Sequence, residues 1–235
     1  MIFDLIVVCG DVHYKFQDLL DKLDKYQIEN SAIIIAGDIG IGFKHPLSEK
    51  SKLNKLNDKF KLHNNILFGV RGNHDDPAYF RGDYNLSNIK LVADYTILNL
   101  NDYNILCVGG AISIDRTERK SYLEYRGRDW WIDEPFKLDI EKLNNIRNVD
   151  FVITHSAPYF TLPYTKNKLD SWLKKDHSLK EDIISERNNI SKMYDILIKN
   201  NNIKKWYYGH FHTHYEMLYD NTKFICLDIN DIQII

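Results

Sequence analysis

Three short apolar segments early in the chain each run into a glycine and a polar side chain, and this repeated pattern constrains the fold most. The segments are residues 5–9, 32–36 and 66–70, and Asp11, Asp38 and Asn73 follow them. Fully apolar runs of this length predict strands that are buried on both faces. Helical spacing of apolar residues after the first two segments predicts a helix after each. Strands that alternate with helices indicate an α/β fold that opens with a parallel sheet, whose carboxyl-end edge is where ligand sites lie.

The rest of the chain adds antiparallel pairing to this plan. We expect a hairpin from 96–100 and 104–108, buried strands at 150–154 and 206–209, helices at 138–146 and 182–198, and a final antiparallel pair from 216–219 and 223–229. Residues 113–136 predict an ordered loop or short helix over the site, and 159–180 predict irregular structure. The expected sheets are therefore mixed.

The composition fits one globular domain over residues 1–235. The chain has 235 residues and is 44% hydrophobic, enough for a sizeable core. Its formal net charge of −2 gives no basic field that would draw the whole molecule onto nucleic acid or anionic lipid. A local basic patch stays open.

The cysteines and the N-terminus favour a cytoplasmic location. Cys9, Cys107 and Cys226 each lie in an apolar run, which predicts reduced core thiols. Asp4 interrupts the N-terminal apolar stretch and no Lys or Arg precedes it, so it does not resemble a signal peptide. Apolar runs stay well below the roughly 18 residues of a membrane span. We expect no membrane association and see no sign of an obligate protein partner.

Five short groups of acids, amides and histidines follow apolar runs and predict a metal site. They are Asp11 with His13, Asp38, Asn73 with His74 and Asp75, His155, and His210 with His212. Imidazole, carboxylate and carboxamide donors suit divalent Mn, Fe, Zn, Ni or Co. The two oxygens of Asp38 are able to bridge two ions, and such a pair clamps a phosphate and lowers the pKa of a bound water. Asn73, His155, His210 and His212 complete the two coordination shells.

His74 and Asp75 are the predicted catalytic residues. His74 follows Asn73 directly and therefore points elsewhere, so it is placed to protonate a leaving alkoxide or to steady the phosphoryl group. We expect Asp75 to fix its orientation.

In order along residues 10–212, these groups match every motif block of a known family. The blocks are Gly-Asp-Val-His at 10–13, Gly-Asp at 37–38, Gly-Asn-His-Asp at 72–75, His-Ser-Ala-Pro at 155–158 and Gly-His-Phe-His at 209–212. The chain thereby resembles the calcineurin-like metallophosphoesterase superfamily. This resemblance implies a four-layer α/β/β/α sandwich with two mixed β-sheets. It also implies hydrolysis of phosphate mono- or diesters by a metal-bridging hydroxide.

The resemblance further implies two divalent ions, drawn from Mn, Fe, Zn or Ni with Mn favoured. One would take Asp11, His13, Asp38 and His212, and the other Asp38, Asn73, His155 and His210. His74 would be the catalytic histidine. The two histidines of the last block would then serve different ions, so that this segment is a second protein bridge.

The segment after the second block departs from the phosphoprotein phosphatases of the superfamily, which carry Asp-Arg-Gly where this chain has Asp38-Ile39-Gly40. The segment 109–116, with Trp130 and Trp131 further on, is similar to small bacterial and phage metallophosphoesterases. A phosphate-binding arginine would come from Arg116, Arg119, Arg126 or Arg128. We select Arg116.

The substrate and several side chains keep alternative interpretations. The expected substrate is a small phosphate ester, with a nuclease or nucleotide phosphodiesterase as the first alternative and a non-catalytic metal-binding scaffold as the second. Trp130 and Trp131 would stack a base or pack in the core, and the Arg-Trp segment would touch substrate or only pack. His214 is expected in a supporting or surface position. The lysines of 44–61 are read as the solvated side of a helix.

Overall fold

The first sheet contains the three strands that the opening pattern predicted. In the computed structural model, which describes residues 1–82 and 84–235 and only the backbone at 124–126, the strand order is β11-β1-β2-β3-β4. The bounds are β1 Ile6–Cys9, β2 Ala32–Ala36, β3 Ile66–Val70, β4 Ile89–Leu91 and β11 Ile232–Ile234. Strands β1 to β4 run parallel, and β11 pairs antiparallel with β1 through Val7 and Ile234.

The second sheet has the order β5-β6-β7-β8-β10-β9. Its strands are β5 Thr96–Leu100, β6 Tyr103–Val108, β7 Phe151–Thr154, β8 Lys205–Tyr208, β9 Tyr215–Tyr219 and β10 Thr222–Cys226. The two outer pairs, β5 with β6 and β9 with β10, are antiparallel, while the inner strands are parallel. The expectation of mixed sheets is therefore confirmed.

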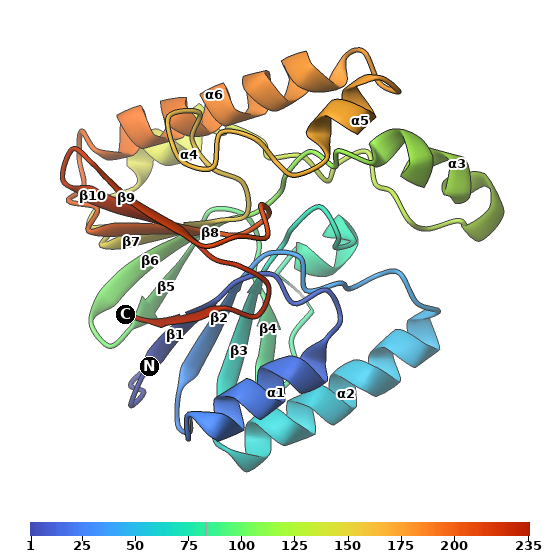
Figure 1. Ribbon diagram of the computed structural model, residues 1–235. Helices are drawn as coiled ribbons and strands as arrows, with labels where there is room; N and C mark the ends of the chain where they lie inside the picture. The colour runs from blue at the N-terminus through green and yellow to red at the C-terminus, as the bar shows by residue number, and fades with distance from the viewer. Residues whose placement is uncertain (83) are drawn as a thin grey trace.

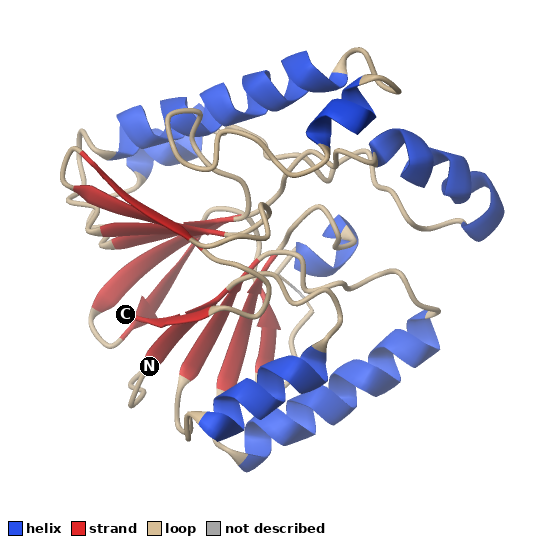
Figure 2. Cartoon of the chain, viewed as in Figure 1, coloured by secondary structure: helices blue, strands red, loops and turns tan. Residues whose placement is uncertain are grey.

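Helices cover the outer face of each sheet, which gives the four layers seen in Figures 1 and 2. The helices are α1 Phe16–Lys25, α2 Pro46–Leu62, η1 Pro77–Phe80, α3 Arg116–Arg126, α4 Ile140–Asn145, α5 Leu169–Leu173 and α6 Leu179–Leu197. Leu19 of α1 and Leu53 of α2 pack on the first sheet, and Ile190 and Met193 of α6 pack on the second. A third core lies between the sheets, where Val8 and Ile34 share a cluster with Ile153.

Several elements differ from the sequence predictions. Residues 113–136, expected as a loop or short helix, contain the three-turn helix α3, which projects beyond the sheets at the right of Figure 1. The short elements η1, β4, α5 and β11 were not predicted, because each is too short to show a hydrophobic period. Within the described residues, no helix combines the length and apolarity that crossing a membrane requires.

Candidate metal centre

The predicted ligands lie at carboxyl ends of strands from both sheets. Asp11, Asp38 and Asn73 follow β1, β2 and β3, whereas His155 follows β7 and the histidines at 210 and 212 follow β8. Contacts across this edge join residues as far apart as Asp11 and His210, which are 199 positions apart. The packing of one sheet on the other therefore assembles the cluster.

A first group of donors consists of Asp11, His13, Asp38 and His212, with one ligand atom from each within 4.8 Å of the others. The Nε2 atoms of His13 and His212 lie 2.9 Å apart. Nε2 of His212 is 3.0 Å from Oδ2 of Asp11, and Nε2 of His13 is 3.7 Å from Oδ2 of Asp38. Imidazole and carboxylate donors that converge in this way suit one divalent ion.

A second group shares Asp38 with the first and adds His155 and His210, again with ligand atoms within 4.8 Å of one another. Nε2 of His155 lies 3.1 Å from Oδ1 of Asp38. The side-chain oxygen of Asn73 lies 3.1 Å from Nε2 of His155 and 2.9 Å from Nδ1 of His210. Asp38 thus occupies the position between two donor groups that the sequence predicts for a bridging carboxylate.

The electrostatics of the cluster fit a site for cations. Asp11 and Asp38 are completely buried, and Oδ2 of Asp38 has no hydrogen-bond partner among the described residues. An unsatisfied buried acceptor costs about 1–3 kcal/mol unless a cation meets it. Burial alone raises the pKa of Asp38, but the charge of His155 is the first of several that lower it well below its usual value. Burial lowers the pKa of His155, yet Asp38 and Asp11 raise it to about 9.

The backbone bends sharply at four predicted ligands. The left-handed φ angles are 49° at His13, 50° at Asp38, 69° at His210 and 53° at His212. Such a conformation costs a non-glycine residue about 1–3 kcal/mol and is concentrated at functional sites. The chain therefore turns at each of these histidines, so that their side chains face the centre. Strand β8 ends at Tyr208, before the histidines.

Two glycines beside the ligands leave room for the carboxylates. A Cβ atom on Gly209 would lie 2.0 Å from Oδ1 of Asp11, and one on Gly72 would lie 2.1 Å from Oδ1 of Asp38. The close approach lets the next backbone N–H, that of His210, donate to Oδ1 of Asp11 over 2.9 Å. Glycine is required here by proximity to a buried carboxylate.

His74 lies beside the first donor group, with its ring centroid 5.2 Å from that of His13. Its backbone N–H donates to Oδ1 of Asp38 over 2.7 Å. Burial lowers the pKa of His74 to about 3 against the opposing charge of Asp38. The imidazole is therefore neutral at neutral pH when no ion is bound.

Asp75 contacts backbone rather than the imidazole of His74. Its carboxylate accepts hydrogen bonds from the N–H groups of Ile39, Gly40, Ile41 and Gly72. Among the described residues it makes no hydrogen bond to the side chain of His74. Asp75 thus joins the loop after β2 to the loop after β3, and its predicted effect on His74 stays a prediction without a direct contact.

Arg119 supports Asn73 through a network that the sequence pattern did not single out. Nδ2 of Asn73 donates to Oγ of Ser113 over 2.9 Å, which turns the amide oxygen toward the histidines. Arg119 donates to the same hydroxyl and, over 3.0 Å, to the backbone oxygen of Asn73. Glu134 pairs with the guanidinium over 3.2 Å. A buried arginine of the segment 113–136 therefore reaches the centre from α3.

Arg116, the predicted phosphate-binding residue, is engaged elsewhere. Its guanidinium lies 2.7 Å from Asp176 and 2.6 Å from Asp182, and it donates to Ser178. These contacts tie the start of α3 to the start of α6. Phosphate binding by Arg116 stays a prediction, and the side chain of Arg126 lies outside the described residues.

Lys166 is a residue that the sequence did not identify. It lies in the segment after the cis peptide bond at Pro163 and lines a small cavity with His210 and Ser156. Its ammonium group has no hydrogen-bond or ion-pair partner in the described part of the chain. Burial lowers the pKa of Lys166 while Asp38 and Asp11 oppose this shift, so its charge lies close to the centre.

An open pocket of about 400 Å³ adjoins the first donor group. It is lined by His13, Tyr14, Gly40, Phe43, Lys44 and His74. Phe43 stacks near His74, and the ring of Trp131 meets Phe43 edge-on at 5.0 Å. One tryptophan of the predicted pair, Trp131, therefore supports the pocket wall.

His214, expected in a supporting or surface position, is exposed, and its Nδ1 lies 2.7 Å from Oδ2 of Asp231.

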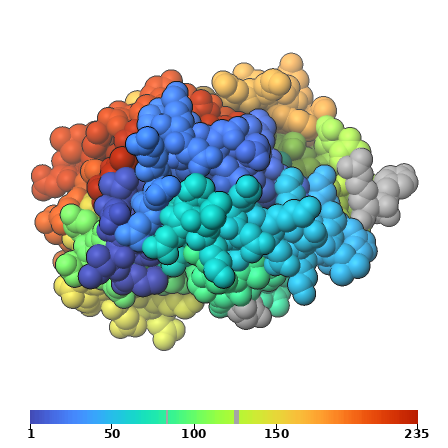
Figure 3. All heavy atoms as spheres, turned by 90° about the horizontal axis from the view of Figure 1, so that it is seen from below, coloured from blue at the N-terminus to red at the C-terminus, as the bar shows by residue number. Residues whose placement is uncertain are grey.

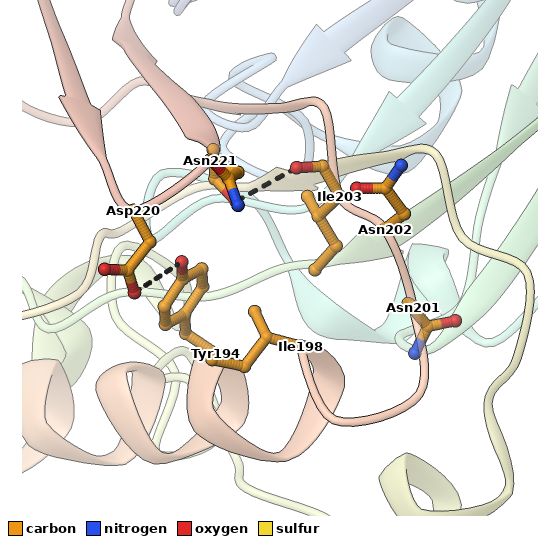
Figure 4. Close-up of a pocket in the computed structure, with 8 residues that line it drawn as sticks. Tyr194, Ile198, Asn201, Asn202, Ile203, Asp220 and Asn221 are labelled. Atoms are coloured by element: carbon orange, nitrogen blue, oxygen red, sulfur yellow. Dashed lines mark hydrogen bonds between the residues drawn. The ribbon is translucent and has the colours of Figure 1, made fainter.

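A larger hollow of about 570 Å³ lies apart from these residues (Figure 4). Tyr194 at its wall donates to Asp220 over 3.5 Å, and Asn201, Asn202 and Asn221 also line it. None of the predicted site residues lines this hollow.

Comparisons with known proteins agree with the motifs and the fold. A model of the calcineurin-like phosphoesterase family matches residues 5–214, a range that includes all the predicted ligands. No curated protein matches the chain.

Among solved structures, the chain is similar to a dimetal phosphatase from Danio rerio, with a TM-score of 0.52 and 10% identity over 97% of this chain and 88% of that one. It is also similar to a candidate 5′-nucleotidase from Staphylococcus aureus, with a TM-score of 0.51 and 14% identity over 99% of this chain and 50% of the other. At these identities the likeness establishes the fold.

Proposed function

Because the chain belongs to the calcineurin-like phosphoesterase family, we propose that it hydrolyses phosphate mono- or diesters with two divalent metal ions. The observation that supports this most is that Asp38 belongs to two groups of donors. In each group the ligand atoms lie within 4.8 Å of one another. One ion would be held by Asp11, His13, Asp38 and His212, and the other by Asp38, Asn73, His155 and His210.

When bound, the ions would polarise the phosphoryl oxygens and lower the pKa of a water between them. The chain's own contribution is to hold the donors in place. Nδ1 of His155 donates to the backbone oxygen of Ala36 over 2.8 Å, which leaves Nε2 facing the centre. The donor set admits Mn, Fe, Zn and Ni, and manganese is the ion that we propose.

Two side chains that are not ligands would act on the substrate. His74, with its neutral ring, donates a hydrogen bond to the leaving oxygen or to the phosphoryl group. Lys166, which lines a cavity together with His210, adds a positive charge that attracts the phosphate group of the substrate. The leaving group occupies the pocket beside His74, where Tyr14, Phe43 and Lys44 line the wall.

The test compares manganese-loaded protein on a bis-aryl and a mono-aryl phosphate, with metal content measured by elemental analysis. We expect hydrolysis of at least one ester, and the preferred one separates diesterase from monoesterase. His74→Ala should keep both ions and lower the rate by about 100-fold or more. Two-ion protein that hydrolyses neither ester contradicts the proposal, and an unchanged rate in His74→Ala removes His74 from the mechanism.

A further inference from the structure

A groove between α1 and α2 carries a concentration of positive charge. It encloses about 430 Å³ and is lined by Tyr14, Lys15, Phe16, Gln17, Leu20, Lys52, Lys55, Leu56 and Lys59. Four of these residues are lysines and none is acidic, although the whole chain has a net charge of −2. Figure 3 looks onto this face of the molecule, where α1 and α2 lie side by side.

Three lysines of α2 lie on the helix face that lines the groove. Lys52, Lys55 and Lys59 follow each other at spacings of three and four residues, so their side chains project in the same direction. They span about 10 Å along the helix. Lys50 and Lys61, also exposed on α2, do not line the groove.

The groove adjoins the pocket beside the metal centre. Tyr14 lines both, and Lys44 extends the row of cations into the pocket that contains His13 and His74. The Nζ atoms of Lys52 and Lys44 lie 3.8 Å and 5.8 Å from the centre of the Tyr14 ring. A chain of phosphates would thus run from the lysines of α2, past an aromatic ring, to the predicted catalytic residue.

We propose that this groove binds the strand of a single-stranded nucleic acid that flanks the phosphodiester at the metal centre. The inference rests on the proposed function and specifies its substrate class. Lysines that track a backbone, with aromatic rings such as Tyr14 and Phe43 beside them, are the arrangement by which proteins bind single strands without regard to sequence. The hollow in Figure 4 lacks this chemistry, since Asp220 and three asparagines line it.

The experiment compares two double variants on the same helix with the same loss of charge. Lys55→Gln/Lys59→Gln removes two groove lysines, and Lys50→Gln/Lys61→Gln removes two lysines outside it. Each manganese-loaded protein is assayed on an oligothymidylate and an oligouridylate of about twelve nucleotides and on the bis-aryl phosphate. Strand binding is measured separately by anisotropy of labelled oligonucleotide over a range of salt.

We expect the groove variant to raise KM for the oligonucleotides about tenfold. The slope of the logarithm of the binding constant against the logarithm of the salt concentration should become shallower by about 0.7 for each lysine lost. The bis-aryl rate and the control variant should stay at the wild-type level. Equal effects of the two double variants on strand binding overturn the groove. Failure of the manganese-loaded protein on both the bis-aryl and the mono-aryl phosphate overturns the proposed function instead, and anisotropy still decides the groove.

Discussion

At the scale of single residues, Asp38 combines the features that distinguish the centre. It is fully buried, its φ is 50°, one of its oxygens lies 3.1 Å from His155, and the other lacks a hydrogen-bond partner among the described residues. Burial of the charge, the left-handed φ and the unpartnered oxygen each cost free energy in the chain alone. Together they indicate that the residue is arranged for a ligand and not for stability.

Asp38→Asn should therefore reduce the content of both ions together, because the amide replaces the one charged oxygen donor common to the two groups. His212→Ala should reduce mainly the ion shared with Asp11 and His13. Elemental analysis after dialysis at limiting manganese distinguishes the two patterns. Full two-ion occupancy in Asp38→Asn would exclude its bridging role.

At the scale of elements, α3 connects the centre to the helices over the second sheet. On one side Arg119 reaches Ser113 and Asn73, and on the other Arg116 reaches Asp176 and Asp182. The neighbouring guanidinium of Arg116 lowers the pKa of Asp176. Since the folded pKa lies below the unfolded value of about 3.9, this pairing stabilises the fold above that pH and is lost as the pH falls further.

Arg116→Gln should increase amide hydrogen exchange in α3 and near the start of α6, while KM for the aryl ester stays close to wild type. Exchange should rise because the substitution removes the ion pairs of Arg116 with Asp176 and Asp182. KM should not change because these two carboxylates, and not the substrate, bind the guanidinium. The difference in exchange should shrink below about pH 3.9, where Asp176 begins to protonate in the unfolded chain. A KM that rises severalfold without altered exchange would instead restore Arg116 as a phosphate-binding residue.

At the scale of the whole molecule, the two sheets share a core and the candidate metal centre, and we propose that residues 1–235 act as one domain. The cluster between the sheets contains Val8 and Ile34 from the first and Cys107 and Ile225 from the second. β11 near the C-terminus pairs with β1 near the N-terminus, so both ends of the chain belong to the same sheet. Neither sheet buries both of its faces without the other.

Thermal unfolding should therefore show one cooperative transition that shifts upward with metal. An ion at 100 times its Kd adds about 2.7 kcal/mol, which corresponds to a rise in Tm of about 5–11 °C for a chain of this size. Calorimetry with and without a chelator measures both quantities. Two separate transitions would contradict the single domain, and a Tm that ignores the chelator would contradict metal binding in the folded state.

The sequence was sufficient for the local structure and the donor chemistry. Residues 32–36 and 66–70 were predicted with the bounds of β2 and β3, since apolar runs ended by glycine or polar residues specify a buried strand locally. Residues 96–100 were predicted with the bounds of β5 as one strand of a hairpin. The three cysteines are buried and free, as their apolar surroundings predicted. The predicted metal ligands could be identified from the sequence because each follows closely on an apolar run that marks the end of a strand.

Only the tertiary structure decided how the distant segments meet and which further side chains reach the centre. The left-handed turns at His13, His210 and His212, the support of Asn73 by Arg119 and the approach of Lys166 depend on packing between the sheets and their loops. The lysines of α2, read from the sequence as a solvated helix face, line a groove because α1 packs beside them and Tyr14 joins that groove to the centre. Hydrophobic periodicity records which face of an element is buried, whereas these contacts depend on what it is buried against.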